Sequence, residues 1–366
     1  MKSVYIHQLF AFRFRNFDTL KIELSPKINV FFGKNGHGKT NLLEAISLAS
    51  SFKAIRPAKN RDLILFDQEQ SRIKASIAGH DHFNVEVDVF LQGKKVCISG
   101  KSVKSASAIN HKLAVITFVP DDLHIVTGGA SFRRQLLDQT ANGLFPIYAA
   151  LYRRFEQAIL QRNRLLKTPG SSQQELEAFN QVFVQTAAPL IKARHAAIRI
   201  LLPEFERNLA HISGNSISAN IAYESIDVTK QDSEETIQTS LWEKLKTLQT
   251  EERFRKTTLL GPHLDDINIT MGTHPARHTA SRGQARAIVL ALKMAQMHCV
   301  ASVRELTPIL LLDDVLGELD QNNAQRLLET IKEIDAQTFI TTTQLELLPD
   351  LCRDYKAFEI HQGTIV

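Results

Sequence analysis

The sequence predicts an α/β protein in which the two ends of the chain build one lobe around a mainly helical insertion. A short apolar run, Ile28–Phe32, leads through a glycine-rich segment into a stretch with helical spacing. From about residue 131 to 260 the pattern is that of amphipathic helices, and alternating strand and helix patterns return after it. We therefore expect one lobe from residues 1–125 with 296–366, and a second, mainly helical lobe from residues 126–295.

The first hundred residues have the pattern of strands, with one helix among them. Apolar and polar residues alternate between 83 and 98 around Gln92-Gly93, which predicts an antiparallel hairpin. Ile28–Phe32 is expected to be a buried strand, and Thr40–Ser50 has the apolar spacing of a helix. The alternating apolar residues of the hairpin are Phe83, Val85, Val87, Val89, Leu91, Val96 and Ile98.

The helical middle has two internal markers. The run from Pro169 to Ser172 predicts a turn between helices, and alternation near residues 217–226 predicts one strand. After the insertion we expect a long helix, a buried strand, a helix and another buried strand. Their ranges are Arg282–Ser302, Pro308–Leu312, Asn323–Ile334 and Gln337–Thr342.

Length and composition exclude several classes of protein. A chain of 366 residues has room for two or three domains, and 43% hydrophobic with 23% charged residues is typical of globular proteins. Charges interrupt every apolar run too early for a membrane span, and arginines stand within the apolar start of the chain, unlike a secretory signal. Cys97, Cys299 and Cys352 are far apart and odd in number, which favours the reducing cytoplasm.

Positive charge is in mild excess and is unevenly distributed. The formal net charge is +5, and residues 151–200 contain eight Lys or Arg against three Glu, which permits an anionic partner. Two further clusters are either solvated faces or contacts to nucleic-acid phosphates. They are Lys53, Arg56, Lys59 and Arg61, and the pair Arg133-Arg134. The nearby aromatic residues Phe52, Phe132, Tyr152 and Phe155 are expected in the core rather than on a stacking surface.

Gly33–Thr40 matches the pattern G-x-x-x-x-G-K-[ST] between a predicted strand and a predicted helix. Glycines let backbone N–H groups point inward around phosphate oxygens, next to the positive end of the helix dipole. Lys39 is then expected to reach the β- and γ-phosphates, and Thr40 to bind Mg²⁺. The candidate nucleotide contacts are Gly33, Lys34, Asn35, Gly36, His37, Gly38, Lys39, Thr40 and Asn41.

The predicted strand Ile309–Leu312 ends in two carboxylates, Asp313 and Asp314. Acidic residues often end strands for solubility, so this pattern is weak alone and gains meaning beside a phosphate-binding loop. Asp313 is expected to hold Mg²⁺, and Asp314 to orient or deprotonate an attacking water, which gives Asp314 and Lys39 catalytic roles.

The helix beginning at Arg282 follows Ser281 and carries Gly283 and Gln284. Ser281 with Gln284 three residues later forms a capping box that simply starts a helix. The same residues could also present an anion site to a γ-phosphate, and the two interpretations are compatible.

The order of these motifs resembles the ABC-type ATPase head. Walker A corresponds to Gly33–Thr40, the signature to Ser281–Gln284, Walker B to Ile309–Asp314 and the D-loop to Glu318–Asp320. More narrowly, the chain resembles the RecF family of bacterial recombinational-repair proteins, related to the SMC and Rad ATPase heads, over nearly its whole length. The segments that carry this resemblance are Asn35–Ile46, Thr258–Asp266, with its family-specific Gly261–Asp266, and Ala280–Arg286.

The resemblance implies an ABC-type P-loop ATPase head with an inserted mainly helical lobe, which holds ATP between the P-loop of one subunit and the signature of another. ATP would then drive formation of a homodimer that clamps DNA. Proteins of this family bind duplex, gapped or junction DNA with RecR and RecO and help load RecA onto single strands covered by single-strand-binding protein. The resemblance thus implies roles in DNA replication, DNA damage repair and the SOS response, with slow DNA-stimulated ATP hydrolysis.

Several positions depart from the family pattern. Leu264 stands where the family usually has arginine, and Thr343 stands where ABC heads commonly have a histidine that senses the γ-phosphate. Threonine cannot carry a positive charge, so slow hydrolysis is expected. Phe118–Asp122 resembles the segment that usually carries the Q-loop glutamine but lacks that residue, and Asp314 replaces the glutamate of transporters.

Two other functions are compatible with the sequence. A P-loop small-molecule kinase would use Lys39 and Asp313 in the same way, but needs no signature at a helix start. An SMC-like head that dimerises without DNA is the second alternative. The histidines near Cys299 and Pro275 lack metal-ligand spacing, and His263 with Asp265 and Asp266 is expected in a shaped structural or interface loop.

Overall fold

The computed structural model describes residues 3–56, 58–103, 107–226, 233–343, 345, 348 and 354–366, so that Cys352 lies outside the described residues. The chain divides into two compact units, residues 1–122 with 290–366, and residues 123–289. The second boundary falls at 289/290 rather than at the expected 295/296, inside the helix α10 (Arg282–Arg304). A boundary within a continuous helix has no turn residues to mark it in a sequence.

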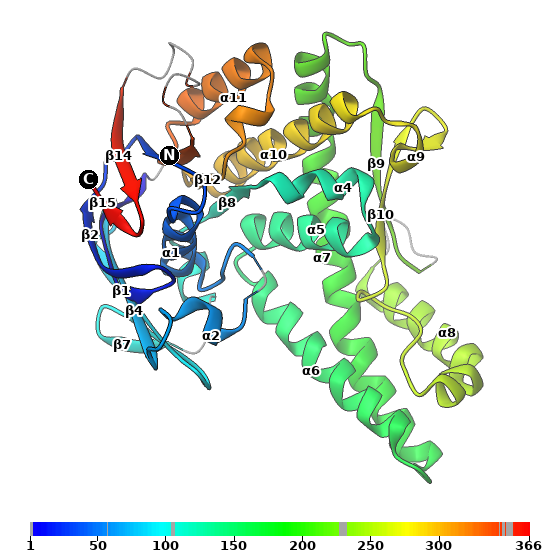
Figure 1. Cartoon of the computed structure of the whole chain (residues 1–366). Coiled ribbons are helices and arrows are strands. Elements are labelled where there is room, and N and C mark those ends of the chain that lie inside the picture. The colour runs from blue at the N-terminus through cyan, green and yellow to red at the C-terminus, as the bar shows by residue number, and fades with distance from the viewer. Residues whose placement is uncertain are drawn as a thin grey trace. The chain divides into compact units, whose positions relative to one another are not determined.

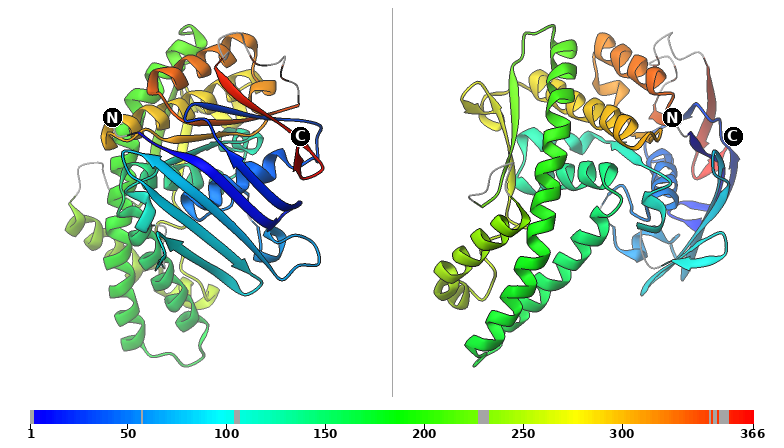
Figure 2. Two further views of the ribbon diagram at one scale, coloured as in Figure 1. Left: turned by 90° about the vertical axis from the view of Figure 1, so that its left-hand side faces the viewer. Right: turned by 180° about the vertical axis from the view of Figure 1, so that it is seen from behind.

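The first unit contains an antiparallel sheet with the strand order β2-β1-β4-β5-β6-β7 (Figure 1; face on in the left view of Figure 2). Alternate residues of β4 and β5 face the core, as expected for an antiparallel sheet with one covered side. The strands are β1 (Val4–Phe14), β2 (Phe17–Glu23), β4 (Gln70–Gly79), β5 (Phe83–Phe90), β6 (Gly93–Ile98) and β7 (Lys101–Val103).

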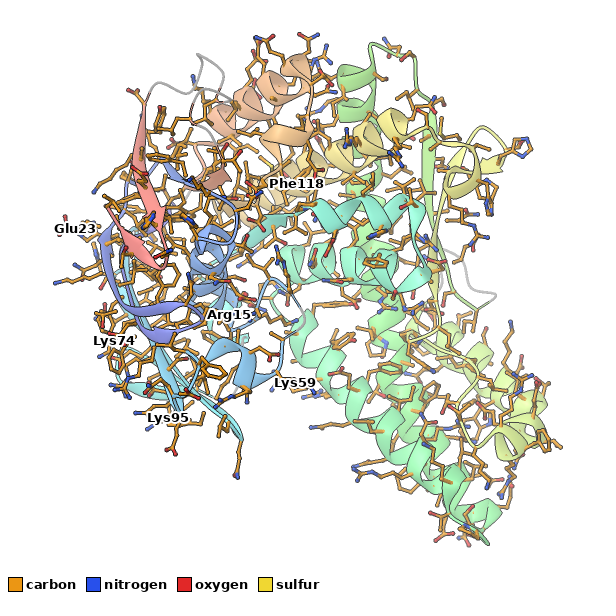
Figure 3. The ribbon with its side chains drawn as sticks, viewed as in Figure 1. Arg15, Glu23, Lys59, Lys74, Lys95 and Phe118 are labelled. Carbon is orange, nitrogen blue, oxygen red and sulfur yellow. The ribbon has the colours of Figure 1, made fainter. Side chains whose placement is uncertain are left out.

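The predicted hairpin is β5 and β6, with Phe90 paired to Gly93. The turn therefore begins one residue earlier than expected, and Leu91 lies in it, exposed, instead of continuing the apolar face. Opposite charges pair across the outer face, where Arg72 faces Asp88 and Lys74 faces Glu86. Figure 3 labels Lys74 and Lys95 among these outward side chains.

The second sheet of this unit has the order β15-β14-β3-β13-β12-β8, in which all strands except β15 run parallel. Its central strands are almost entirely buried, as in parallel sheets that are covered on both faces, and β12 accordingly appears in the sequence as a continuous apolar run. The predicted strands at 28–32, 308–312 and 337–342 are confirmed. The bounds are β3 (Ile28–Phe32), β8 (Val115–Phe118), β12 (Ile309–Leu312), β13 (Thr338–Thr342), β14 (Tyr355–His361) and β15 (Thr364–Ile365).

Gln337 joins the two sheets of the first unit. Its side-chain amide accepts a hydrogen bond from Ile6 N at 2.8 Å and donates to Ile6 O at 2.9 Å, as a neighbouring strand would. The pairing of β1 with β4 shifts register between Ile6 and Gln8, so the amide satisfies backbone groups next to this irregularity. A buried glutamine is stable here because its polar atoms are paired.

The helices of the first unit include two long ones that the sequence predicts. They are α1 (Lys39–Ser51) and α11 (Gln321–Ile334), together with the short α2 (Asn60–Leu63), α3 (Ser107–Asn110), η1 (Pro120–Leu123, which ends in the second unit) and η2 (Leu316–Glu318). By length and composition α10 could cross a membrane, but 78% of its most apolar window is buried inside the structure. Such burial is the pattern of a core helix.

The second unit is mainly helical, with a three-stranded antiparallel sheet of order β11-β10-β9. The helices α6 and α7 run side by side in both views of Figure 2, and the predicted turn from Pro169 to Ser172 joins them. Ser172 and Glu175 form a capping box that starts the 41-residue α7. The elements are α4 (His124–Thr127), α5 (Ala130–Leu144), α6 (Tyr148–Lys167), α7 (Gln173–Ser213), β9 (Ala219–Glu224), α8 (Glu234–Arg255), β10 (Asp266–Met271), β11 (His274–Pro275) and α9 (Ala276–Thr279).

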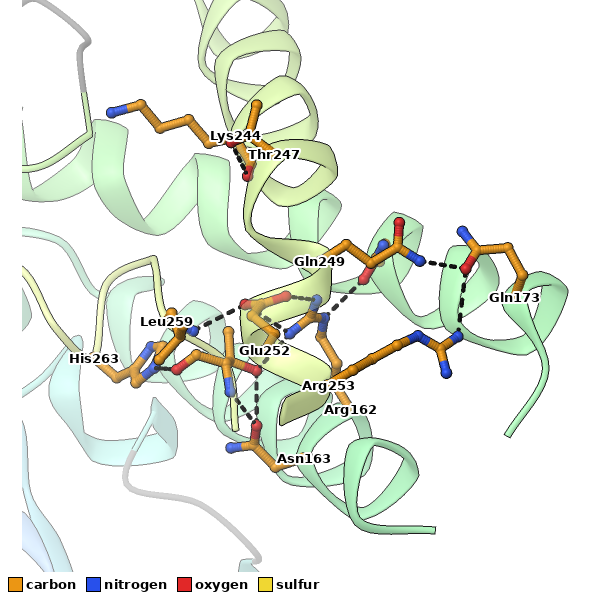
Figure 4. Close-up of polar contacts among 12 residues, drawn as sticks. Arg162, Asn163, Gln173, Lys244, Thr247, Gln249, Glu252, Arg253, Leu259 and His263 are labelled. Carbon is orange, nitrogen blue, oxygen red and sulfur yellow. Dashed lines mark hydrogen bonds and ion pairs between the residues drawn. The ribbon is translucent and has the colours of Figure 1, made fainter. Parts of the chain in front are cut away.

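A fully buried ion pair holds α6, α7 and α8 together (Figure 4). The Arg162 guanidinium donates to Glu252 Oε2 at 2.6 Å and to Asn180 Oδ1 at 2.8 Å. A further hydrogen bond of 2.7 Å reaches the hydroxyl of Thr258, and Glu252 accepts from Leu259 N at 2.9 Å. The pair therefore also fixes the chain immediately after α8.

We expect Glu252→Leu to lower the free energy of unfolding by about 3–5 kcal/mol, because Arg162 would remain buried without its carboxylate. The double variant Arg162→Met/Glu252→Leu should recover most of this loss, since neither charge is then buried alone. Urea denaturation measures both. The exposed pair Arg207–Glu204 is the control, and removing it should cost less than about 1 kcal/mol. Unchanged stability in Glu252→Leu would contradict the account.

Candidate phosphate-binding site

The predicted motifs of the first unit meet at one edge of the parallel sheet. The loop Gly33–Thr40 follows β3, Asp313 and Asp314 follow β12, and Thr343 follows β13. Because β13 pairs in parallel with both β3 and β12, the carboxyl ends of these strands lie next to one another. This edge is where open α/β sheets generally bind ligands.

The loop between β3 and α1 surrounds the Lys39 side chain. Lys39 is 4% exposed, and its ammonium group donates to Gly33 O at 2.8 Å and to Lys34 O and Asn35 Oδ1 at 3.3 Å. Gly36 has a φ of 81° and lies against open space, so its role is conformational. The lysine thus spans the loop, with its charge held by carbonyl oxygens that phosphate oxygens could replace.

Asp313 is the centre of a polar cluster and is 2% exposed. Its Oδ1 accepts hydrogen bonds from Thr40 Oγ1 at 2.8 Å and from Thr341 Oγ1 at 2.9 Å. Its Oδ2 pairs with Arg56 Nη2 at 3.1 Å. The structure therefore brings Thr40 and Asp313 together as the motifs predict. It also adds Thr341 and gives Arg56 a specific partner.

The sequence analysis did not predict a role for Thr341 at the site, because this residue has the pattern of an ordinary member of a buried strand. Its hydroxyl donates to Asp313 and accepts from Asp314 N at 2.8 Å, so it connects the two acidic residues. Three of the five residues of the buried strand Thr338–Thr342 are threonines, and hydroxyl groups within a buried strand are the sequence signal that could have drawn attention to Thr341.

Asp314 has an unusual backbone and a perturbed carboxyl group. Its φ is 53°, in the left-handed region that non-glycine residues rarely adopt. Burial raises the pKa of the Asp314 carboxyl above its usual value, and the charge of Asp313 acts in the same direction, while Lys39 opposes it. A carboxyl with a raised pKa is a better proton acceptor near neutral pH.

The remaining predicted contacts of the first unit lie around this centre. His37 is half-buried, Lys34 and Asn35 are exposed, and Thr343 is exposed directly after β13. The Asn41 amide donates to Asn16 Oδ1 at 2.8 Å, so this side chain is engaged with the turn between β1 and β2.

The predicted signature belongs to the second unit, where Ser281 and Gly283 are exposed at the start of α10. Gln284 N donates to Ser281 Oγ at 3.2 Å, and Ser281 N donates to Gln284 Oε1 at 2.8 Å. The capping box predicted from the sequence is therefore confirmed. The predicted D-loop residue Asp320 has a similar local role, since its side chain accepts from Asn323 N and caps α11.

The segment Gly261–Asp266 is shaped by arginines from the helices of the second unit. Arg194 donates to Pro262 O at 2.6 Å, and Arg134 donates to Asp265 O at 2.9 Å. Arg133 is 5% exposed and forms an ion pair with Asp266 at 2.8 Å. The idea that Arg133 is a solvated residue or a nucleic-acid contact is therefore wrong, because its guanidinium is buried and paired. Leu264, in contrast, is 51% exposed.

Of the aromatic residues expected in the core, Phe155 is buried, whereas Phe52, Phe132 and Tyr152 are half-buried.

A phosphate-binding loop after the first strand of a parallel sheet and an acidic strand end beside it define the P-loop ATPase class. The interruption of this unit by a mainly helical one is the arrangement of the ABC ATPase head. Comparisons with known proteins agree with this class. The family described as RecF/RecN/SMC N terminal domain matches residues 5–366.

Related proteins show which family within this class the chain belongs to. The protein named DNA replication and repair protein RecF of Symbiobacterium thermophilum is 33% identical over 99% of this chain and 98% of its own length. The protein of the same name from Citrifermentans bemidjiense is 34% identical over 96% of this chain and 97% of its own. The chain therefore belongs to the RecF family of DNA replication and repair proteins.

Solved structures agree with this family and with the ATPase-head fold. A structure of the recombination mediator protein RecF-ATP in the RecFOR pathway covers 100% of this chain and 98% of its own, with a TM-score of 0.89 and 28% identity. The Smc head domain from Pyrococcus furiosus covers 99% of this chain and 95% of its own, with a TM-score of 0.56 and 15% identity, and so shares the fold. Family membership removes the small-molecule kinase alternative.

The arginine-rich packing around Gly261–Asp266 makes a prediction about pH. Burial lowers the pKa of His263 from 6.5 to about 4, and Arg134, Arg162 and Arg194 act in the same direction. The unfolded chain thus binds a proton below pH 6.5 that the folded protein binds only below about pH 4, so stability falls as pH falls through this window.

We expect His263→Gln to remove about 2 kcal/mol of the loss in unfolding free energy between pH 6.5 and 4. Denaturation series at several pH values, with wild type and variant in parallel, isolate this contribution from those of the carboxylates. Equal slopes for both proteins would refute the buried, neutral state of His263.

Proposed function

We propose that this protein is an ATP-dependent DNA-binding protein of recombinational repair and replication, which dimerises on ATP to clamp gapped or double-stranded DNA. The observation that carries this proposal is the hydrogen bond between Thr40 of the phosphate loop and Asp313 at the end of β12, beside the buried Lys39. Related proteins support it, since they are named DNA replication and repair protein RecF, and one similar solved structure is that of RecF-ATP.

Phosphate binding is assigned to the loop Gly33–Thr40 and to Lys39. The ammonium group of Lys39 contacts carbonyl and amide oxygens of the loop, and the β- and γ-phosphates of ATP offer stronger, charged acceptors in the same place. The N-terminus of α1 adds partial positive charge. Nucleotide binding therefore exchanges neutral acceptors of Lys39 for anionic ones.

The oxygen atoms around Asp313 fit a magnesium ion. The Thr40 hydroxyl and the Asp313 carboxylate lie 2.8 Å apart, and hydroxyl and carboxylate oxygens are the ligands that Mg²⁺ prefers. When bound, Mg²⁺ would neutralise phosphate charge. Arg56 holds the second carboxylate oxygen, and its side chain is 54% exposed, so it can leave the carboxylate toward solvent or toward phosphate.

The signature is assigned to a second copy of the chain. Ser281 and Gly283 are exposed at the start of α10, where the partial positive charge of a helix N-terminus suits the γ-phosphate of a nucleotide held by the other subunit. Gln284 orients Ser281 through the capping box. ATP thereby becomes part of the dimer interface.

Hydrolysis is assigned to Asp314 as general base, with Thr343 near the γ-phosphate. Threonine offers a hydrogen bond without positive charge, so stabilisation of the developing negative charge is weaker than with histidine, and hydrolysis is slow. Such a rate suits a switch. The same proposal includes stimulation of ATP hydrolysis by DNA and a cytoplasmic location. The exposed side chains of Lys53, Lys59 and Arg61 would contact DNA phosphates. RecR and RecO would be the partners with which the protein assists RecA loading.

Ser281→Arg should abolish ATP-driven dimerisation while the monomer still binds ATP, because the larger charged side chain blocks the signature without touching the P-loop. Lys39→Met should lose ATP binding, dimerisation and ATP-dependent DNA retention together. Sedimentation velocity with Mg²⁺-ATP, with and without duplex DNA, measures dimerisation and DNA retention, and equilibrium dialysis measures ATP binding. Normal dimers of the Ser281 variant would reject the signature assignment. Dimers that fail to retain DNA at any salt concentration would favour the SMC-like alternative without DNA.

Asp314→Asn should form ATP-dependent dimers on DNA that persist, with hydrolysis reduced by about 100-fold or more. In the wild type, the rate should fall as pH falls through the pKa of Asp314, which lies above the usual 3.8, because only the carboxylate accepts a proton. The dependence of kcat on pH measures this acid limb. Unaltered hydrolysis in the variant would assign the base elsewhere.

A further inference from the structure

The carbonyl oxygen of His37, in the middle of the phosphate loop, is held by two donors from outside the loop. Asn16 Nδ2 donates to it at 3.0 Å from the turn between β1 and β2. Gly363 N donates to it at 3.0 Å from the turn of the C-terminal hairpin, β14–β15. Segments 21 and 326 residues away from His37 in sequence thus meet on one backbone atom.

This carbonyl is linked to the phosphate site through a rigid peptide unit. The described peptide bonds are trans, so the His37 C=O and the Gly38 N–H lie in one plane and point in opposite directions. Two hydrogen bonds that draw the carbonyl away from the loop therefore direct the Gly38 N–H toward its inner side. That N–H is one of the groups with which a P-loop binds phosphate.

Asn16 is well fixed for this task. Asn41 of α1 donates to Asn16 Oδ1 at 2.8 Å, which leaves Asn16 Nδ2 to face His37. The preceding residue, Arg15 (labelled in Figure 3), forms an ion pair of 2.6 Å with Glu44 of α1, which is 3% exposed. The turn between β1 and β2 is thus bonded twice to the helix that follows the phosphate loop.

Glycines permit this close approach. A Cβ atom on Gly38 would lie 2.6 Å from Asn16 Nδ2, and one on Gly363 would overlap the carbonyl oxygen of Asn16. Gly33 is packed in the same way against the carbonyl oxygen of Ile360 in β14. His37 adds a side-chain contact, with Nδ1 at 3.3 Å from that same oxygen. The hairpin therefore touches the phosphate loop at its first residue, Gly33, and at its middle, His37.

We propose that Asn16 and the turn of the C-terminal hairpin form a clamp that holds the phosphate loop in the shape that binds the phosphates of ATP. Asn16 and Gly363 are positioning residues, since they act through the His37 peptide and do not touch the nucleotide themselves. The inference rests on the proposed ATP site and adds that nucleotide affinity depends on the last residues of the chain.

The test is the affinity of full-length Asn16→Ala for a fluorescent ATP analogue, with inorganic tripolyphosphate as competitor. We expect affinity for both ligands to fall by about three- to tenfold, the equivalent of one to two lost hydrogen bonds. Thr19→Ala, an exposed position on β2, and Lys356→Ala, whose ammonium group bonds Glu23 O from β14, are matched controls. Both should bind as wild type.

The tripolyphosphate measurement separates positioning from a general loss of structure. Weaker binding of ATP and tripolyphosphate by Asn16→Ala, at an unchanged melting temperature without nucleotide, supports the clamp. Gly363→Ala should also weaken the binding of both ligands. If the Gly363 variant does not fold, the result for Asn16→Ala decides whether the clamp exists. Wild-type affinity in Asn16→Ala overturns the clamp while leaving the ATP site intact. If wild type itself binds no ATP and Lys39→Met changes nothing, the proposed function fails instead.

Discussion

Parallel pairing of β13 with β3 on one side and β12 on the other is the constraint on which the site depends. It places the end of a strand at residue 32 next to strand ends at residues 312 and 342. The hydrogen bond from Thr40 to Asp313 spans 273 positions of sequence and exists only because this pairing closes the loop. The second unit, residues 123–289, lies between Thr40 and Asp313 in the sequence, so the phosphate-binding centre combines residues from before and after the insertion.

Charge balance follows from the same geometry. Asp313 and Asp314 lie together at the end of a buried strand, which would be costly without nearby cations and donors. Arg56 and the hydroxyl groups of Thr40 and Thr341 provide that compensation for Asp313. Burial raises the pKa of the Asp314 carboxyl, and the charge of Asp313 adds to this effect, while Lys39 and Arg56 oppose it. The two adjacent carboxylates thus have different surroundings, which fit Asp313 for holding a cation and Asp314 for accepting a proton.

Both units use buried arginine or amide groups to fix irregular backbone. Arg162 and Arg194 reach the chain between α8 and β10, and Gln337 completes the pairing of a shifted strand. Loops cannot satisfy their backbone groups through regular secondary structure, so side chains must do so where the loop is buried. Asn16 does the same for the phosphate loop. The shapes of functional segments are therefore set by polar side chains that lie far away in sequence.

The sequence by itself determined which local segments of the first unit carry the predicted phosphate site. A glycine-rich loop between a β-branched apolar run and a helix, and an apolar run ending in two aspartates, are local patterns that specify a strand, a phosphate loop and an acidic strand end. The capping box at Ser281 could also be predicted from the sequence, because its two partners are three residues apart. Tertiary structure alone decided that Thr341 joins the two aspartates, that Arg133 is buried with Asp266, and that Asn16 and Gly363 meet at His37. Hydrophobic periodicity records which face of an element is buried, but it does not record which distant residue lies against that face. That choice is made when the sheet closes.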